Sequence, residues 1–465
     1  MKKTELILQK DKTAPIDDRI FGNFIEHIEN CILGGLCDAG NPLSDENGIR
    51  MDVLEKCKAL APTVLRFPGG TVMGIYHWEE HIGPVEQRRK RRNIVWGNRM
   101  CHEFGTAEFV QYCRAIGAEP MICVNMPTGS AEEAANWVEY CNGTEDTYYA
   151  NLRRSHGYEE PFNVKYWCVG NESYAEPDLG IQHDVNIYIR DAWEFTKYMK
   201  MTDPTIELVY VGHNEEWNRR VLDSLGCVCD YLSLHFYANT GDDPERPWKQ
   251  LEDYVRDTLK PAENLITEVN AREEEFNVWY RIPQRKGDIK IALDEWNIWN
   301  TAPNGKSKYG LIQDYTWRDA LWVGSFLNLL INHCGSIGIA NMAQMVNVIA
   351  PIMAEKDGSY CQTTFYPMQY YRKMAGSERI HATCEGLDVC VTKQESTCIA
   401  FIVNKEEEDM QVALPAELAE AVRMTADAPD AINTLTYDAV HIETVTGRGE
   451  QAFIVPANSI CILKM

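Results

Sequence analysis

Two patterns of apolar and polar positions alternate along the first three quarters of the chain. Short runs of apolar and β-branched residues predict buried strands, and stretches with apolar residues three or four apart predict amphipathic helices. The predicted strands are residues 19–26, 63–67, 120–125, 165–170, 206–211, 230–235, 289–294 and 336–340. The predicted helices between them are residues 51–60, 106–116, 131–141, 186–201, 216–225, 251–282 and 317–332.

This series of eight strands favours an α/β fold, the (β/α)₈ or TIM barrel, over residues 15–370. A doubly wound open sheet is the alternative, but such a sheet usually has fewer strands and often a glycine-rich phosphate turn. No GxGxxG motif follows the first predicted strand. The barrel is therefore the fold that we expect.

The pattern changes at residue 371. Segments such as DVCVTKQ, TCIAFIVNK and SICILKM are short and alternating, and Gly, Pro, Asn and Asp separate them. They predict a C-terminal antiparallel β-sandwich, jelly-roll-like, over residues 371–465, in which only residues 416–422 have a helical pattern. Residues 1–14 also alternate, and we expect them to add a strand to this domain.

Composition narrows the classes of function. The 465 residues carry a net charge of −24, which makes nucleic acid an unsuitable partner because phosphates repel acidic surfaces. No run of 18 apolar residues is present, so no membrane span is expected.

The first residues lack the apolar core of a secretion signal. Sixteen cysteines, scattered singly in apolar strings, favour a reducing compartment, and we expect a cytoplasmic protein.

Two glutamates follow predicted strands of the barrel. The string WCVGNE ends at Glu172, after the fourth strand, and IALDEW contains Glu295, after the seventh. Chemistry in such barrels takes place at the carboxyl ends of the strands. A pair of carboxyl groups is what cleavage of a glycosidic bond requires, about 5–5.5 Å apart in retaining enzymes and about 6.5–9.5 Å apart in inverting ones. The pair predicts a sugar hydrolase.

Polar residues at neighbouring strand ends suit the same task. Asn171 precedes the first glutamate and can bind a sugar hydroxyl next to the cleaved bond. His235 and Tyr237 lie on one face of the sixth strand, where they can orient a carboxyl group. Arg66, near the end of the second strand, needs an anionic partner if it is buried, and Glu26 ends the first strand. Each of these residues is by itself as compatible with a structural role.

Further candidates contribute aromatic faces and an amide. Trp96, Trp296 and Trp299 offer flat surfaces for sugar C–H groups, and Gln344 follows the eighth strand. Other chemistries lack support, because GxSxG, HExxH and Walker motifs are absent. The eleven histidines show no ligand spacing, so we predict neither a metal nor a cofactor.

At these residues the chain resembles glycoside hydrolase family 51, the α-L-arabinofuranosidases. The resemblance covers nearly the whole barrel, and it runs through FGNFIEHI, LRFPGG, HWEEHIGPVEQR, NWVEYCN, LRRSHGY, WCVGNE, DPTIELV, DYLSLHFY, LDEWNIW and AQMVNVIAPI. It implies retention through a covalent glycosyl-enzyme intermediate, no cofactor and often a hexamer. It further implies that Glu172 is the acid/base and Glu295 the nucleophile. The sugar subsite that it implies is lined by Glu26, Arg66, Trp96, Asn171, Tyr237, Trp299 and Gln344.

Two departures from the family pattern leave the identity of the bound sugar undetermined. Typical members read PGGN after the second strand, whereas this chain reads PGGT, so Thr71 replaces a sugar-binding Asn. Many arabinofuranosidases read GNEMDGPWQ after the acid/base, whereas this chain reads GNESYAEPD and has Tyr174 and Glu176 in place of a bordering Trp. Retaining hydrolysis is little affected by either change.

We therefore predict a retaining, exo-acting hydrolase that releases terminal α-L-arabinofuranosyl residues from oligosaccharides. One alternative is a retaining glycosidase on the same scaffold that acts on a galactofuranoside, a xyloside or a β-1,4-glucan. Another is a carbohydrate-binding protein without catalysis, against which the presence of both glutamates argues.

Overall fold

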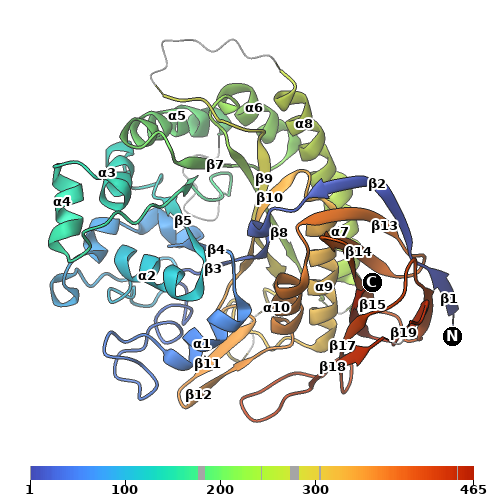
Figure 1. Cartoon of the computed structure of the whole chain (residues 1–465). Coiled ribbons are helices and arrows are strands. Elements are labelled where there is room, and N and C mark those ends of the chain that lie inside the picture. Colours follow the sequence, from blue (N-terminus) through green and yellow to red (C-terminus); the bar gives the residue numbers. More distant parts are fainter. Residues whose placement is uncertain (1, 176–183, 242, 273–281, 303–304, 448) are drawn as a thin grey trace.

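The computed structural model describes residues 2–175, 184–241, 243–272, 282–302, 305–447 and 449–465. Its centre is a closed barrel of eight parallel strands, ordered β10-β3-β4-β5-β6-β7-β8-β9, with helices around the outside (Figure 1). This confirms the expected (β/α)₈ fold. The barrel strands are β3 (Gly22–Phe24), β4 (Val64–Phe67), β5 (Glu119–Val124), β6 (Tyr166–Val169), β7 (Glu207–Val211), β8 (Tyr231–Ala238), β9 (Lys290–Ile298) and β10 (Ile337–Ala343).

The outer helices follow the strands in chain order. They are α1 (Met51–Leu60), α2 (Thr106–Ile116), α3 (Ala131–Asn142), α4 (Tyr148–Ser155), α5 (Val185–Thr202), α6 (Glu215–Leu225), α7 (Arg246–Tyr254), α8 (Lys260–Asn270), α9 (Trp317–Asn332) and α10 (Phe365–Met374). Side-chain caps begin several of them. Ser130 accepts a hydrogen bond from the Glu133 amide at the start of α3, and Thr316 and Asp319 form a capping box at the start of α9.

Short elements lie before, between and after the barrel strands. They are the 3₁₀ helices η1 (Asp18–Phe21), η2 (Thr71–Ile75), η3 (Trp78–His81) and η4 (Val85–Gln87), the π-helical turn η5 (Val255–Leu259) and the hairpin β11 (Ile352–Glu355) with β12 (Gly358–Cys361). Small and apolar side chains fill the barrel interior, among them Val64, Cys123, Cys168 and Ala292. All sixteen cysteines are free, and most are buried, which agrees with their expected role as core residues.

The C-terminal domain consists of two sheets that share an apolar core. The larger sheet has the order β18-β17-β20-β15-β14-β13-β2, and the smaller has β1-β16-β19. The strands are β1 (Lys2–Glu5), β2 (Ile7–Pro15), β13 (Glu378–Thr383), β14 (Asp388–Gln394), β15 (Thr397–Asn404), β16 (Met410–Ala413), β17 (Glu420–Ala426), β18 (Val440–Thr446), β19 (Ala452–Val455) and β20 (Ser459–Lys464). The N-terminal residues thus supply a strand to each sheet, and both chain ends lie at this domain (Figure 1).

The two domains share a continuous core. The outer face of the seven-stranded sheet packs against α9 and α10, where the rings of Tyr371 and Phe401 lie 4.4 Å apart. Gly324 in α9 permits this close approach, because a Cβ atom there would lie 2.9 Å from the side chain of Ile460. The boundary between residues 370 and 371 stays a prediction, since the packing is continuous across it.

Three predicted elements are wrong in part. The first strand begins only at Gly22, because Asp17 accepts a hydrogen bond from the Arg19 amide and starts a 3₁₀ turn instead. The helix predicted over 251–282 begins earlier, at Arg246, and ends at Asn270; residues 273–281 lie outside the described residues. The helical pattern at 416–422 is overridden by pairing of β17 with β18 and β20. Among the described helices, none combines the length and apolar character that a membrane span requires.

Candidate active site

A sharp turn after β6 presents Asn171 and Glu172 at the carboxyl end of the barrel. The strand ends at Val169, and Gly170 then adopts a φ of 86° and Glu172 a φ of 40°. A left-handed conformation is unfavourable for a glutamate, so it persists only where the surrounding structure holds it. Such strained positions are concentrated at functional sites, which makes this turn a candidate for chemistry.

An irregularity in β9 brings two neighbouring acidic residues to the same site. Ser233 and His235 of β8 pair with Ala292 and Glu295 of β9, so three residue steps of β9 span two steps of β8. The pairing of β9 with β10 shifts over the same region. In a regular strand, consecutive side chains point to opposite faces, but the extra residue of a bulge changes this alternation. Asp294 and Glu295 are both buried and both reach the same cation.

That cation is Arg66 of β4, whose side chain is only 1% exposed. Its Nη1 donates to Glu295 Oε1 at 2.5 Å, its Nη2 donates to Asn171 Oδ1 at 2.7 Å, and its Nε lies 3.2 Å from Asp294 Oδ2. Burial alone would lower the pKa of Arg66, but Asp294 and Glu295 raise it well above its ordinary value. Burial would likewise raise the pKa of Asp294, but the charge of Arg66, together with His235 and Ser233, lowers it to about 2. The charges at this point are therefore paired.

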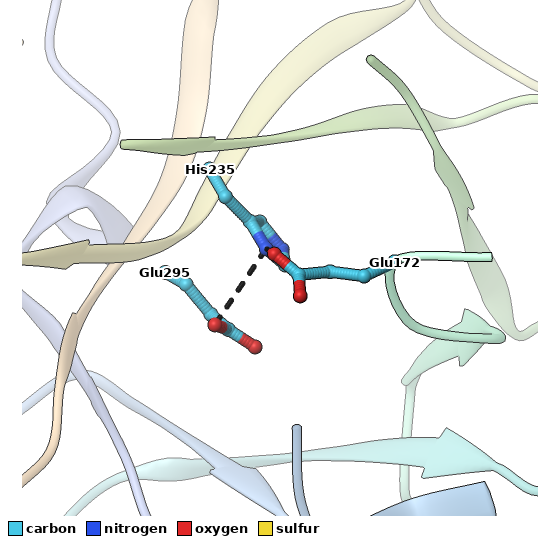
Figure 2. A group of neighbouring side chains, drawn as sticks. All are labelled: Glu172, His235 and Glu295. Atoms are coloured by element: carbon cyan, nitrogen blue, oxygen red, sulfur yellow. Dashed lines mark hydrogen bonds and ion pairs between the residues drawn. The ribbon is translucent and has the colours of Figure 1, made fainter. Parts of the chain in front are cut away.

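His235 connects the two glutamates (Figure 2). Its Nδ1 lies 2.8 Å from Glu172 Oε1 and 3.6 Å from Glu295 Oε2, and its Nε2 lies 3.2 Å from the hydroxyl of Ser233 and 3.5 Å from Asp294 Oδ1. Burial alone would lower the pKa of His235, but the three surrounding carboxylates raise it well above its ordinary value. The imidazole is therefore a cation that donates to Glu172. Burial would raise the pKa of Glu172, but the hydrogen bond and charge of His235, together with Tyr174 and Arg66, lower it.

Tyr237 completes the surroundings of Glu295. Its hydroxyl donates to Glu295 Oε2 at 2.8 Å, while Arg66 occupies Oε1, so two donors fix the orientation of this carboxylate. The ring of Trp299 packs edge-on against Tyr237, with centroids 5.6 Å apart. Donors from β4 and β8 thus hold the side chain in one orientation.

Glu26 lies on the other side of the same pocket. Its Oε1 accepts from the Val72 amide at 2.9 Å and from Trp96 Nε1 at 3.2 Å, and its Oε2 accepts from Gln344 Nε2 at 3.1 Å. Burial raises the pKa of Glu26 to about 7. Gly70 is required beside it, because a Cβ atom at that position would lie 2.3 Å from the carboxylate.

These side chains surround a pocket of about 140 Å³. It is lined by Phe24, Glu26, Ile28, Gly70, Thr71, Trp96, Asn171, Glu172, Tyr237, Glu295, Trp299, Leu311, Gln344, Val348 and Ile349. A larger cleft of about 670 Å³ lies between α7, α9 and the C-terminal domain, but neither of the paired glutamates lines it. Polar groups converge in the small pocket, which makes it the better candidate for a binding site.

Nine of the eleven site residues predicted from the sequence line this pocket, and Arg66 and His235 contact its glutamates. The further candidate Trp296 does not belong to the site, because it is fully buried and stacks on Phe326 of α9 at 4.2 Å. Three contacting residues were given no role from the sequence: Asp294, Ser233 and Tyr174. The only signal for Asp294 is an acidic residue inside an otherwise apolar strand, in the string IALDEW.

One oxygen of Glu172, one of Glu295 and a ring nitrogen of His235 lie within 4.8 Å of one another. Among the described residues, these three form the one group close enough to ligate a metal ion. Arg66 already places a positive charge 2.5 Å from Glu295, which opposes binding of a second cation there. The absence of a metal stays a prediction.

Comparisons with known proteins identify the family of this chain. Residues 56–256 match the family model "Alpha-L-arabinofuranosidase 1 domain", and residues 294–459 match "Alpha-L-arabinofuranosidase C-terminal domain". The chain is 34% identical to a protein of Aspergillus niger named "Probable alpha-L-arabinofuranosidase C", over 97% of this chain and 95% of that one. It is also 34% identical to the "Intracellular exo-alpha-(1->5)-L-arabinofuranosidase" of Acetivibrio thermocellus, over 92% and 88% of the two chains.

The solved structure of a GH51 alpha-L-arabinofuranosidase from Thermotoga petrophila superposes with a TM-score of 0.90. The two chains are 34% identical, and each is covered over its full length. The chain belongs to glycoside hydrolase family 51. This family-51 chain is therefore a glycoside hydrolase, and its barrel and C-terminal domain have the arrangement of the family's solved structures.

Replacing Arg66 by Met tests how strongly the family-51 site depends on its buried cation. The substitution leaves Asp294 and Glu295 without their partner, and we expect unfolding free energy to fall by about 3–5 kcal/mol. Urea unfolding at pH 7 measures this change. The matched control is Arg89→Met, because Arg89 pairs with Glu80 at 2.9 Å but is 69% exposed. The control should lose less than about 1 kcal/mol. An equally small loss in Arg66→Met would contradict the account.

Proposed function

We propose that this chain is a retaining, exo-acting α-L-arabinofuranosidase in which Glu295 is the nucleophile and Glu172 the acid/base. The observation that carries the proposal is the separation of the two carboxylates, since one oxygen of Glu172 lies within 4.8 Å of one oxygen of Glu295. Retaining glycosidases place their carboxyl groups about 5–5.5 Å apart, whereas inverting ones need about 6.5–9.5 Å to admit a water molecule. The spacing supports direct attack by a carboxylate.

In the first step, Glu295 attacks the anomeric carbon and the glycosidic oxygen leaves with a proton from Glu172. Arg66 and Tyr237 hold the attacking carboxylate in place. In the second step, Glu172 takes a proton from water, the water oxygen attacks the anomeric carbon, and the bond to Glu295 breaks. Asn171 lies beside both glutamates, where its amide suits a hydrogen bond to the sugar.

The proton for the leaving group is held by the Glu172–His235 pair. Glu172 by itself has a lowered pKa, which is unsuited to a general acid, but His235 carries a proton 2.8 Å away and has a raised pKa. Two groups this close titrate together, so the pair retains one proton at neutral pH. In the tautomer that reacts, this proton is on the Glu172 carboxyl group and His235 is neutral, and the carboxyl group gives the proton to the glycosidic oxygen as the bond breaks.

The size of the pocket supports release of one terminal sugar. Its volume of about 140 Å³ lies below the range of roughly 300–1,000 Å³ that larger ligands occupy. Glu26 and Gln344 offer hydrogen bonds to sugar hydroxyls, and Trp96 and Trp299 offer apolar faces. A pocket of this size suits the single sugar at the end of a chain.

The arabinofuranosyl specificity is supported by the names of the similar proteins. Thr71 lines the pocket where typical family members carry Asn, so galactofuranosides, xylosides and β-1,4-glucans are tested as alternatives. A carbohydrate-binding protein without catalysis would have no need of two carboxylates so close together.

We further propose that the enzyme acts in the cytoplasm and forms a homo-oligomer. Sixteen free cysteines support a reducing compartment, and one similar protein is named intracellular. The oligomer is an inference from family membership, for which a hexamer is the expectation. Light scattering of the purified protein determines the number of subunits.

Variants of the two glutamates test the assignment. Glu172→Ala should reduce kcat/KM on arabino-oligosaccharides by about 10²–10⁴-fold, because general acid catalysis is lost. The loss should be smaller on 4-nitrophenyl α-L-arabinofuranoside, whose leaving group needs little protonation. Glu295→Ala should abolish turnover of both substrates. Steady-state kinetics with both substrates measures these changes.

Azide serves as the control. It should restore turnover of the nitrophenyl substrate to Glu172→Ala and give a glycosyl azide of retained configuration, because it replaces water in the second step. No such product should form with Glu295→Ala. Substantial activity of Glu295→Ala without azide would overturn the proposal.

A panel of 4-nitrophenyl glycosides tests the specificity. We expect the highest kcat/KM on the α-L-arabinofuranoside, and at least about tenfold less on the galactofuranoside, because a small pocket discriminates against an added carbon. Thr71→Ser, which keeps the hydroxyl, should preserve this order. A preference for any other sugar would reject the arabinofuranosyl specificity, and binding without hydrolysis of any member would favour the non-catalytic alternative.

A further inference from the structure

Tyr174 lies two residues after Glu172 and has no part in the mechanism above. Its hydroxyl donates to Glu172 Oε1 at 3.2 Å. Its ring stacks on His213, with centroids 3.9 Å apart and planes 13° from parallel, and lies edge-on to Trp217 of α6. Contacts from the loop after β7 and from α6 therefore hold the phenol in position against the carboxylate.

The two oxygens of Glu172 have different surroundings. Oε1 accepts from His235 at 2.8 Å and from Tyr174 at 3.2 Å. Across the described ranges, no hydrogen bond reaches Oε2. Figure 2 shows one oxygen of Glu172 beside the imidazole ring and the other directed away from it. Two donors on one oxygen thus leave the other available to a leaving group.

We propose that Tyr174 is a positioning residue for the general acid: together with His235 it fixes Oε1 of Glu172, so that Oε2 exchanges the proton with the glycosidic oxygen. The inference rests on the proposed role of Glu172. It assigns to Tyr174 a second effect, which is to set the upper end of the pH range in which Glu172 and His235 keep their shared proton.

The direction of this effect follows from the charges. A donor to a carboxylate favours its ionised form, and the hydrogen bond from Tyr174 contributes to the lowered pKa of Glu172. Burial and the charges of Glu172 and Glu295 raise the pKa of Tyr174, so the phenol remains a donor. Burial lowers the pKa of His213. Among the described residues, the titratable and charged groups that act on the Glu172 carboxylate or its two donors include Arg66, Tyr174, His213, His235, Tyr237, Asp294 and Glu295.

Tyr174→Phe tests the inference, because it keeps the stacked ring and removes only the hydroxyl. The alkaline limb of the pH profile of kcat/KM on an arabino-oligosaccharide should move upward by roughly half to one pH unit, since the ionised carboxylate loses a hydrogen bond. The rate at the pH optimum should fall more on the oligosaccharide than on 4-nitrophenyl α-L-arabinofuranoside, whose cleavage depends less on the acid.

Two further variants make the result specific. Tyr231→Phe is the matched control, because Tyr231 also donates to a carboxylate, that of Glu207, at 3.1 Å, but at the amino-terminal end of the barrel strands. The alkaline limb of its pH profile should not move. His213→Ala keeps the Tyr174 hydroxyl but removes the ring that supports it, and its limb should move in the same direction by a smaller amount. This variant also carries the test if Tyr174→Phe does not fold.

The inference is overturned if the limb of Tyr174→Phe stays in place, if both substrates lose activity equally, or if Tyr231→Phe moves the limb as far. A failure of the proposed function is distinguishable from these outcomes. It would appear as an equal loss on both substrates in Glu172→Ala, whatever the behaviour of Tyr174→Phe.

Discussion

The buried guanidinium group of Arg66 is the interaction on which the site depends. It contacts Asn171 from the turn after β6 and Asp294 and Glu295 from β9, so one side chain ties together three parts of the barrel mouth. Arginine suits this position because its planar fork presents several donors in fixed directions and keeps its charge when buried. Without it, carboxylates so close together would repel each other, and the arrangement of the pocket would be lost.

The site departs from regular structure at the positions that carry its chemistry. The bulge in β9 brings Asp294 and Glu295 to the same cation, and the left-handed turn at Glu172 directs a second glutamate toward the first. His235 then lies between them as a shared donor. Functional sites are where local rules are expected to fail, because binding geometry there outweighs local conformational preference.

The sequence predicted the barrel and the approximate place of the site because strands and helices alternate regularly and Glu172 and Glu295 follow strands. It did not predict the partner role of Asp294, since a bulge depends on pairing between strands distant in the chain. Periodicity also failed at residues 416–422, where pairing in a sheet overrides helical preference. Trp296 was a candidate for the pocket, but in the structure it packs into the core against α9.

The central claim is that Glu295 forms a covalent bond to the sugar. The most direct measurement is mass spectrometry of the enzyme after incubation with a 2-deoxy-2-fluoro arabinofuranosyl substrate bearing a good leaving group. The fluorine slows hydrolysis of the intermediate, so we expect one sugar attached per chain and a labelled peptide whose modified residue is Glu295. Attachment at Glu172, or unmodified enzyme that turns over its normal substrate with inverted configuration, would contradict the account.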